Sequence, residues 1–277
     1  MGRLEHLEHD PDGRATHPKL DIDLLRGSQE PLSTPARLNG AMFVSGTRKL
    51  YVGPLVATRR HAHHAAQIVM APEGLYIEDG VGGRIRASTA VIPPRLLHGH
   101  GACAHGAFLF VDGDDLASRE LCRNAEPRCE TWRRNALDLG VPRDPTLEQA
   151  RALITTVLSA VDLHQPPAPR HPAARRMCTY LDGEGHVDLA SLSHEAGLSP
   201  RQMRHAFARD VGLPMRAYLR WKRLRRAIAA VEEGASLSAA AASAGFADSA
   251  HLSRVFREQF GMTPTQGLCS ITWRTLD

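Results

Sequence analysis

The sequence predicts an α+β chain in which an N-terminal β-barrel is followed by an all-α domain with two helix-turn-helix units. Three observations lead to this prediction. Short apolar runs separated by glycine and proline fill residues 39–113, whereas helical apolar spacing continues from residue 171 to about residue 260. A proline-rich stretch, HQPPAPRHP at residues 164–172, separates the two patterns. Within the helical part, segments 197–214 and 245–264 follow the same pattern.

The totals place the chain among soluble globular proteins of more than one domain. Its 277 residues are long for one domain, and 43% hydrophobic with 23% charged residues suits a soluble protein. No uncharged apolar run reaches the length of a membrane span, so no membrane partner is expected. The N-terminal segment lacks the apolar core of a secretory signal and is expected to be disordered. Five cysteines without a CxxC pair favour free thiols in a reducing cytoplasm.

The positive charge is concentrated in the C-terminal part of the chain. From residue 171 onward there are 14 lysines and arginines against 10 aspartates and glutamates. This excess equals the formal net charge of the whole chain, +4. A polyanion such as DNA is therefore expected to bind this part.

Six short runs predict the strands of the barrel. Each run is apolar or alternating, and most end at glycine or proline, which is typical of a small barrel or sandwich. The runs are AMFVSG, KLYVGPLVA, QIVMAPEG, LYIEDG, TAVIPP and GAFLFVDG.

Two helices are expected after these strands, DDLASRELCRNA and PTLEQARALITTVLSAV. The second has one apolar face. This face either packs on the barrel or pairs with a second copy of the chain. Its position between barrel and linker favours pairing, and therefore a homodimer. The face consists of Leu147, Leu153, Ile154, Val157, Leu158 and Val161.

The first of the two similar segments, GLSPRQMRHAFARDVGLP, predicts a capped helix. Ser199 is placed to cap the N-terminus, with Pro200 at the first helical position and Gln202 completing a capping box. Apolar residues follow at a spacing of four, and Gly212 ends the helix. The expected buried face consists of Met203, Phe207 and Val211.

The second segment, GFADSAHLSRVFREQFGMTP, predicts the same design. Asp248 takes the cap, Leu252, Phe256 and Phe260 form the buried face, and Gly261 ends the helix. Each long helix is preceded by a shorter one, DLASLSHEAG or LSAAAASAG, and by a turn that contains glycine. Two helices joined by such a turn form a helix-turn-helix.

Basic and polar side chains are expected to face outward at the N-terminal turns of both long helices. That end of a recognition helix reaches base edges in the major groove, where arginine can bond guanine and glutamine adenine. The helix N-terminus also favours phosphate. The alternative is a helical bundle with a solvated polar face, and any single outward residue contacts a base, a phosphate or solvent. The candidates are Ser199, Arg201, Gln202, Arg204, His205, Ser249, Ala250, His251, Ser253, Arg254 and Arg257.

Between the two units, LPMRAYLRWKRLRRAIAAVEEG predicts one long helix. About 20 helical residues span about 30 Å, close to one turn of B-DNA, so this helix can hold two recognition helices in successive major grooves. A basic stripe contains Arg220, which is added to the DNA-binding candidates; a solvated face is the alternative. The parallel core stripe is Ala217, Trp221, Leu224, Ile228 and Val231.

Residues from about 171 to 264 resemble the DNA-binding domain of the arabinose-regulator (AraC/XylS) family of bacterial transcription factors. The resemblance rests on the two Gly-turn-helix segments, on the connector opening PMRAYL and on AGF…HLSRVFREQFGMTP. It implies seven helices and two helix-turn-helix units with asymmetric DNA contacts. One position departs: where the family usually has a Tyr-Arg pair after Pro264, this sequence has Gly267 and Leu268.

Histidines gather in the predicted barrel. HAHHAAQIVMAPEG contains His61, His63 and Gln67, and PPRLLHGH supplies His98. These spacings resemble the two cupin signatures, in which two His and a Glu, then a later His, meet inside a barrel. The departures are Gln67 for Glu, Arg95 for Gly and Ala102 for Asn.

The histidine pattern has three interpretations. Three imidazoles and one amide oxygen can hold a divalent transition metal. A metal-free pocket for a small-molecule effector is favoured, because the resemblance implies cupin-like sensor barrels that often keep these histidines without metal. Purely structural histidines are the third interpretation.

Together these features predict a ligand-responsive transcription regulator without catalytic residues. The expected partners are promoter DNA, a small-molecule effector, RNA polymerase and a second copy of the chain, at the nucleoid in the cytoplasm. The alternative is a metal-dependent cupin enzyme with a helical interaction domain, which Gln67 in place of a carboxylate weakens. The expected organisation is a lead-in over 1–18, a cupin-like sensing and dimerisation domain over 19–163, a linker over 164–170 and the DNA-binding domain over 171–277.

Overall fold

The structure is a computed structural model, and it covers both predicted parts of the chain. The expected lead-in, the linker and most of the helix DDLASRELCRNA lie outside the described residues. Within the described part, no helix is both long and apolar enough to cross a membrane. The described residues are 37–113, 115, 118, 125–134, 140–161, 172–182, 189–211 and 214–276.

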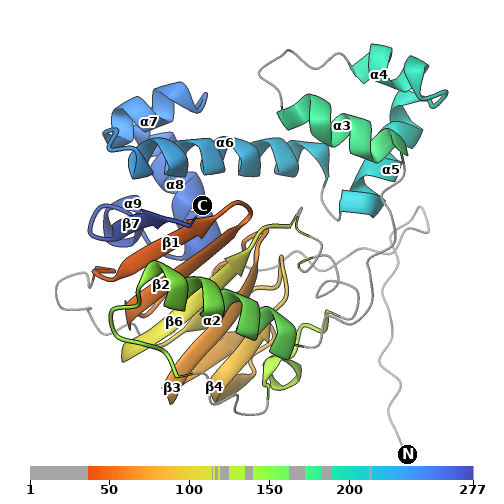
Figure 1. The fold of residues 1–277 in the computed structure, drawn as a ribbon. Coiled ribbons are helices and arrows are strands. Elements are labelled where there is room, and N and C mark those ends of the chain that lie inside the picture. The colour runs from red at the N-terminus through yellow and green to blue at the C-terminus, as the bar shows by residue number, and fades with distance from the viewer. Residues whose placement is uncertain are drawn as a thin grey trace, which may run out of the picture. The chain divides into compact units, whose positions relative to one another are not determined.

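Seven strands form one mixed sheet (Figure 1). Their order is β4-β3-β6-β2-β1-β7, and β5 pairs with β3. The pairing of β1 with β7 is parallel, and the others are antiparallel. The strands are β1 (Ala41–Ser45), β2 (Arg48–Leu55), β3 (Ala66–Asp79), β4 (Arg84–Ile92), β5 (His98–His100), β6 (Cys103–Val111) and β7 (Thr272–Thr275).

The expected closed barrel is not confirmed. Among the described strands, pairing runs from β4 to β7 and does not return, so the sheet is open. The runs QIVMAPEG and LYIEDG, expected as two strands, form the single strand β3, whose register against β4 shifts between Met70 and Leu75. Gly74 lies in this irregularity with φ 82°. Gly74 therefore marks a bulge within a strand rather than the end of a strand.

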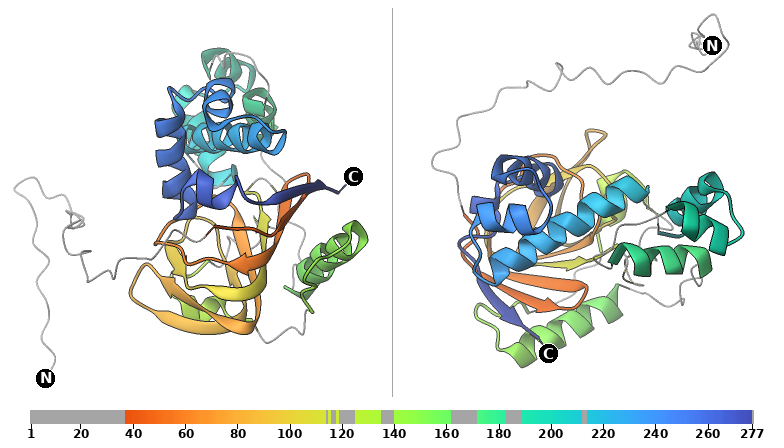
Figure 2. Two further views of the ribbon diagram at one scale, coloured as in Figure 1. Left: turned by 90° about the vertical axis from the view of Figure 1, so that its left-hand side faces the viewer. Right: turned by 90° about the horizontal axis from the view of Figure 1, so that it is seen from above.

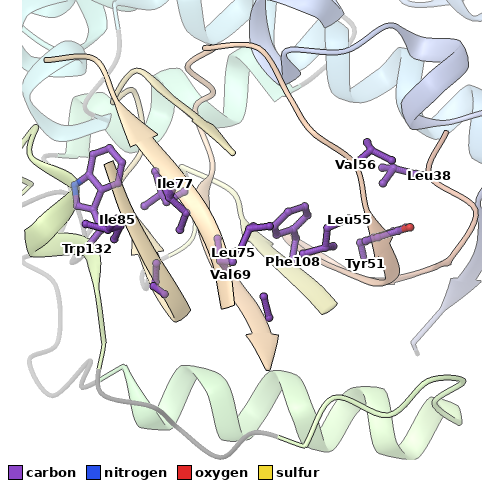
Figure 3. Packing of buried hydrophobic residues seen from close by; sticks show 14 of the residues in the cluster. Leu38, Tyr51, Leu55, Val56, Val69, Leu75, Ile77, Ile85, Phe108 and Trp132 are labelled. Carbon is purple, nitrogen blue, oxygen red and sulfur yellow. The ribbon is translucent and has the colours of Figure 1, made fainter. Parts of the chain in front are cut away.

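The two faces of the sheet bury different side chains, as the alternation of a strand requires. One face contains Tyr51, Val69, Leu75, Ile77 and Phe108, which pack together (Figure 3). The opposite face contains residues such as Phe43, Leu50 and Ile68. The two sets come from the same strands and point to opposite sides.

Helix α2 (Leu147–Ala160) covers the second of these faces. Its N-terminus has a capping box between Thr146 and Gln149. Its buried residues belong to the same core as Phe43 and Leu50, so the apolar face packs on the sheet of its own chain. The favoured interpretation of this face as a dimer surface is therefore not supported. Those buried residues are Ala150, Leu153, Ile154 and Val157.

The C-terminal part is helical from α3 to α9. Helix α6 extends from the first helix-turn-helix unit (α4 and α5) to the second (α7 and α8), as predicted for the connector (Figure 2). The helices are α3 (Pro172–Asp182), α4 (Leu189–Glu195), α5 (Pro200–Val211), α6 (Met215–Glu232), α7 (Leu237–Ser243), α8 (Ser249–Phe260) and α9 (Pro264–Gly267).

The two helix-turn-helix units have separate hydrophobic cores. The core of the first contains Met177, Phe207 and Tyr218, the last two with ring centroids 5.3 Å apart. The core of the second includes residues of α6, α7 and α8 together with Ala65, which immediately precedes β3. Phe110 of β6 also packs against it. The second unit therefore shares its core with the sheet, whereas the first is joined through α6.

The C-terminal segment is not entirely helical, contrary to the all-α expectation. After the short helix α9 the chain enters β7, which pairs with β1. A Cβ atom at Gly267 would lie 3.0 Å from Sδ of Met262 and 3.2 Å from the ring of Phe256. The departure from the family pattern at Gly267 thus permits a close approach that turns the chain toward the sheet.

Candidate functional site

Both long helices begin with the predicted caps. The backbone N–H of Ser199 donates to Oε1 of Gln202 at 2.9 Å, and the N–H of Gln202 donates to Oγ of Ser199 at 3.2 Å. In α8 the N–H of His251 donates to Oδ1 of Asp248 at 2.6 Å. Gly261 ends that helix with φ 66°, in the left-handed region that favours glycine. The caps fix where each helix begins, and the apolar side chains at helical spacing decide which face is buried.

The candidate DNA-binding side chains lie on the outer faces of these helices. Leu198 and residues of α5 from Arg201 to Arg209 line a surface hollow of about 750 Å³. The exposed candidates are Ser199, Arg201, Gln202, Arg204, His205, Arg220, Ala250, Arg254 and Arg257, and the half-buried ones are Ser249, His251 and Ser253.

Four of these candidates make contacts within the protein, including Ser199 through its capping bond. A bidentate contact with adenine needs both amide atoms of a glutamine, but Oε1 of Gln202 already accepts a bond in the capping box. Arg220 forms an exposed ion pair with Glu258 of α8 at 3.1 Å. The ring of His251 lies edge-on to Phe246, with centroids 5.2 Å apart. Gln202 therefore keeps the capping role that the sequence predicted, and Arg220 makes a contact within the fold that the sequence did not predict.

The predicted histidine set converges at one place. His61, His63 and His98 each offer a ring nitrogen, and these atoms lie within 4.8 Å of one another. Backbone bonds between His61 and His98, at 2.8 and 2.9 Å, bring the two segments together. Nε2 of His63 lies 2.9 Å from Oε1 of Gln67, and Nε2 of His98 lies 3.2 Å from the same oxygen. We call these four residues the histidine cluster.

Burial keeps the imidazoles of the histidine cluster neutral. It lowers the pKa of His61 to about 3, with a further contribution from the neighbouring His63. Burial also lowers the pKa of His63, and that of His98 well below its ordinary value. Each ring is therefore a neutral imidazole at physiological pH, which is the form that binds metals.

The hydrogen bonds of the rings decide which nitrogen carries the proton. Nδ1 of each ring lies 2.8 Å from a backbone carbonyl, that of Arg59, Ala65 or Leu96. A carbonyl only accepts, so each Nδ1 donates and each Nε2 presents a lone pair. In His63 and His98 that lone pair faces Oε1 of Gln67, which is also an acceptor. Either a cation lies between these atoms, or the amide is rotated so that its NH₂ group donates to both rings.

Arg95 holds the turn that precedes His98. Its φ of 69° lies in the left-handed region, and its backbone N–H donates to the carbonyl of His63 at 2.8 Å. The cupin signature has glycine at this position, and the structure shows why, because the turn requires a positive φ. An arginine there costs about 1–3 kcal/mol of backbone strain.

A cavity of about 80 Å³ adjoins the histidine cluster. His61 and Gln67 form part of its wall, and the rest comes from both the sheet and the C-terminal helices. Its lining is mostly aromatic and aliphatic, with a few polar groups, which is the composition of a small-molecule site. The aromatic residues of the wall are Tyr51, Phe108, Phe110, Trp221, Phe256, Phe260 and Trp273.

Several of these wall residues were not predicted as site residues. Arg225 of α6 and Asp112, which follows β6, form an ion pair at 3.2 Å and both line the cavity, as does Lys49 of β2. Trp273 reaches it because β7 returns to the sheet. Arg225 and Asp112 lie more than a hundred positions apart in the sequence, so no local spacing could have paired them.

Comparison with known proteins identifies the helical part. A family model described as a helix-turn-helix domain matches residues 192–268. A search of curated proteins found no match. Among solved structures, ToxT from Vibrio cholerae O395 is similar at 10% identity and TM-score 0.48, over 80% of this chain and 96% of that one. Unsaturated fatty acid-bound ToxT from Vibrio cholerae strain SCE256 is similar at 10% identity and TM-score 0.47, over 80% and 94% of the two chains.

The caps, the outward basic turns and the family match define the C-terminal part as a domain of the helix-turn-helix class, whose usual ligand is DNA. Residues 192–268 are the stretch that matches this helix-turn-helix family.

Proposed function

We propose that this protein is a ligand-responsive regulator that binds promoter DNA sequence-specifically through two helix-turn-helix units and senses an effector in the cavity beside the histidine cluster. The observation that carries the proposal is the composition of the cavity wall. Phe108 and Phe110 come from the sheet, whereas Trp221, Phe256 and Phe260 come from α6 and α8. A bound molecule would therefore touch the sheet and the second unit at once.

This placement would couple ligand binding in the cavity to the position of the DNA-binding helices. A ligand that binds one arrangement of α6 and α8 more tightly than another shifts the equilibrium between them. The aromatic lining favours a small, largely apolar effector, and the polar wall residues would fix its orientation. The sensing part would be cupin-like in its histidine cluster, although its sheet is open.

DNA binding is tested by electrophoretic mobility shift with duplexes selected from a random library. We expect saturable, sequence-selective binding whose affinity falls steeply with salt, because cationic side chains displace counterions from phosphates. Binding that is not sequence-selective, or that does not depend on salt, would contradict the proposal.

The two recognition helices are expected to contribute differently to base selection. We predict that Arg201→Ala or Arg204→Ala changes the preferred sequence more than Ser253→Ala, because the exposed α5 arginines can bond guanine bidentately. Each arginine contact should be worth about 1–3 kcal/mol of discrimination. Selection of bound duplexes followed by sequencing measures the change, with Ser253→Ala as the matched comparison. Equal loss of selectivity in all three variants would refute this assignment.

The remaining partners belong to the same proposal. The proposed partners are RNA polymerase and a second copy of the chain, in the cytoplasm. The domain bounds expected from the sequence are part of the same proposal. Because the buried face of α2 packs on its own sheet, a homodimer would have to use another surface. Sedimentation velocity of the full chain, with and without duplex, measures this directly.

No observation favours the enzyme alternative. Among the described residues that line the cavity, the carboxylate is that of Asp112, which is ion-paired to Arg225. Such a group is committed to a structural contact rather than placed as a general acid or base.

A further inference from the structure

The histidine cluster lies directly against the end of the second recognition helix. A Cβ atom at Gly261 would lie 2.7 Å from Nδ1 of His61 and would also overlap the carbonyl oxygen of Arg59. The backbone N–H of Arg59 in turn donates to the carbonyl of Gly261 at 3.4 Å. The left-handed glycine that ends α8 therefore fits against the segment that carries His61, with no room for a side chain.

Aromatic contacts continue from the histidine cluster into the helices. The ring of Phe260, the last residue of α8, lies 6.1 Å from that of His63 and 4.5 Å from that of Phe256. His64 lies edge-on to Trp221 of α6 at 5.7 Å. Displacement of the segment that carries His63 and His64 would therefore also displace side chains of α6 and α8. Packed cores shift between discrete arrangements rather than deform freely.

The arrangement of donors favours a cation over a rotated amide. The NH₂ group of Gln67 has two hydrogens, which would satisfy Nε2 of His63 and of His98. Among the described residues, no hydrogen bond reaches Nε2 of His61, whose Nδ1 is bound to the carbonyl of Arg59. A cation can be shared by all three rings. Backbone carbonyls that accept from the Nδ1 atoms are the usual outer partners of metal-bound histidines.

We propose that His61, His63, His98 and Gln67 form a regulatory site for a divalent transition metal, and that its occupancy controls DNA binding by setting how the end of α8 is seated at Gly261. This inference rests on the proposed function and names the regulation of that same site. The exposed arginines of α8, Arg254 and Arg257, then move with the helix that carries them.

The first test concerns the site itself. Gln67→Glu is expected to tighten Zn²⁺ binding by about tenfold or more, since it adds a negative charge beside a dication in a low-dielectric site. Isothermal titration of the full chain with Zn²⁺ measures this. If neither the parent protein nor the variant binds Zn²⁺, and the variant only melts earlier, the rotated amide is correct and the inference is overturned.

The second test concerns the coupling. The affinity for a selected duplex is measured by fluorescence anisotropy with chelator-treated protein, with and without Zn²⁺. In the parent protein the ratio of the two affinities is expected to differ from one by about 5–150-fold, the usual range of coupling between sites. Gly261→Ala disrupts the close fit against His61, so its ratio should approach one when it is measured at a Zn²⁺ concentration that titration shows to saturate the variant.

Gly197→Ala is the matched control. Gly197 also follows a helix with φ 63°, but a Cβ atom there meets nothing within 4 Å. Both variants thus carry the same backbone strain, and Gly197→Ala should keep the ratio of the parent protein. The inference is overturned if bound Zn²⁺ leaves the duplex affinity of the parent protein unchanged, or if Gly261→Ala keeps the ratio of the parent protein. Either result leaves the proposed function standing. Failure to bind any duplex under either condition overturns the proposed function, and this inference with it.

Discussion

Replacement of Phe256 by alanine is expected to lower the free energy of unfolding of the sheet and the second helix-turn-helix unit together, by about 3–5 kcal/mol. Phe256 is 3% exposed and belongs to the core that includes Ala65 and contacts Phe110 of the sheet. The lost ring would leave a cavity that lowers the free energy of unfolding of every element packed around it.

Phe207→Ala provides the comparison, because it removes the same ring from the separate core of the first unit. Phe207 is fully buried against residues of α3, α5 and α6. The same loss of about 3–5 kcal/mol is expected there, but it should appear as local unfolding of α3 to α5 with the sheet intact. Hydrogen exchange of peptides from β2 and β6 distinguishes the two. If Phe207→Ala reduces protection in those strands as much as Phe256→Ala does, the two cores are one cooperative unit.

The helical elements were predictable because their signals are local. Ser199 with Gln202, and Asp248 with Gly261, mark helix ends through bonds that span three residues or fewer and through one left-handed glycine. The apolar stripe at Trp221 and Leu224 likewise follows from the period of the helix alone. The sheet was less predictable because bulges and strand ends share the same residues, as Gly74 shows.

The position of β7 could not be predicted for a different reason. TWRT has no clear alternation, and its pairing with β1 depends on a contact across more than 200 residues. The same limit explains why the histidine cluster was found and the cavity wall was not. His61, His63 and Gln67 share one short motif, whereas Arg225 meets Asp112 only in the folded chain.

The metal-free protein is expected to lose stability as the pH falls from about 6.5 toward 4. Burial lowers the pKa of His100 and of His64 to about 4, and that of His61 to about 3. In the unfolded chain these imidazoles return to an ordinary pKa near 6.5. Below that pH the unfolded state binds more protons than the folded state, so the free energy of unfolding decreases as the pH falls. The stabilisation is complete above about pH 6.5, and the loss continues until the folded-state pKa values are reached.

The size of this loss can be assigned to one residue at a time. Each buried imidazole that stays neutral contributes a slope of about 1.4 kcal/mol per pH unit within this window. His100→Gln should therefore reduce the slope by about one proton, because glutamine does not titrate. Urea unfolding in chelator at pH 7.5, 6 and 5 gives the slopes. A slope for His100→Gln equal to that of the parent protein would mean that this buried ring becomes protonated without leaving its place beside Phe108.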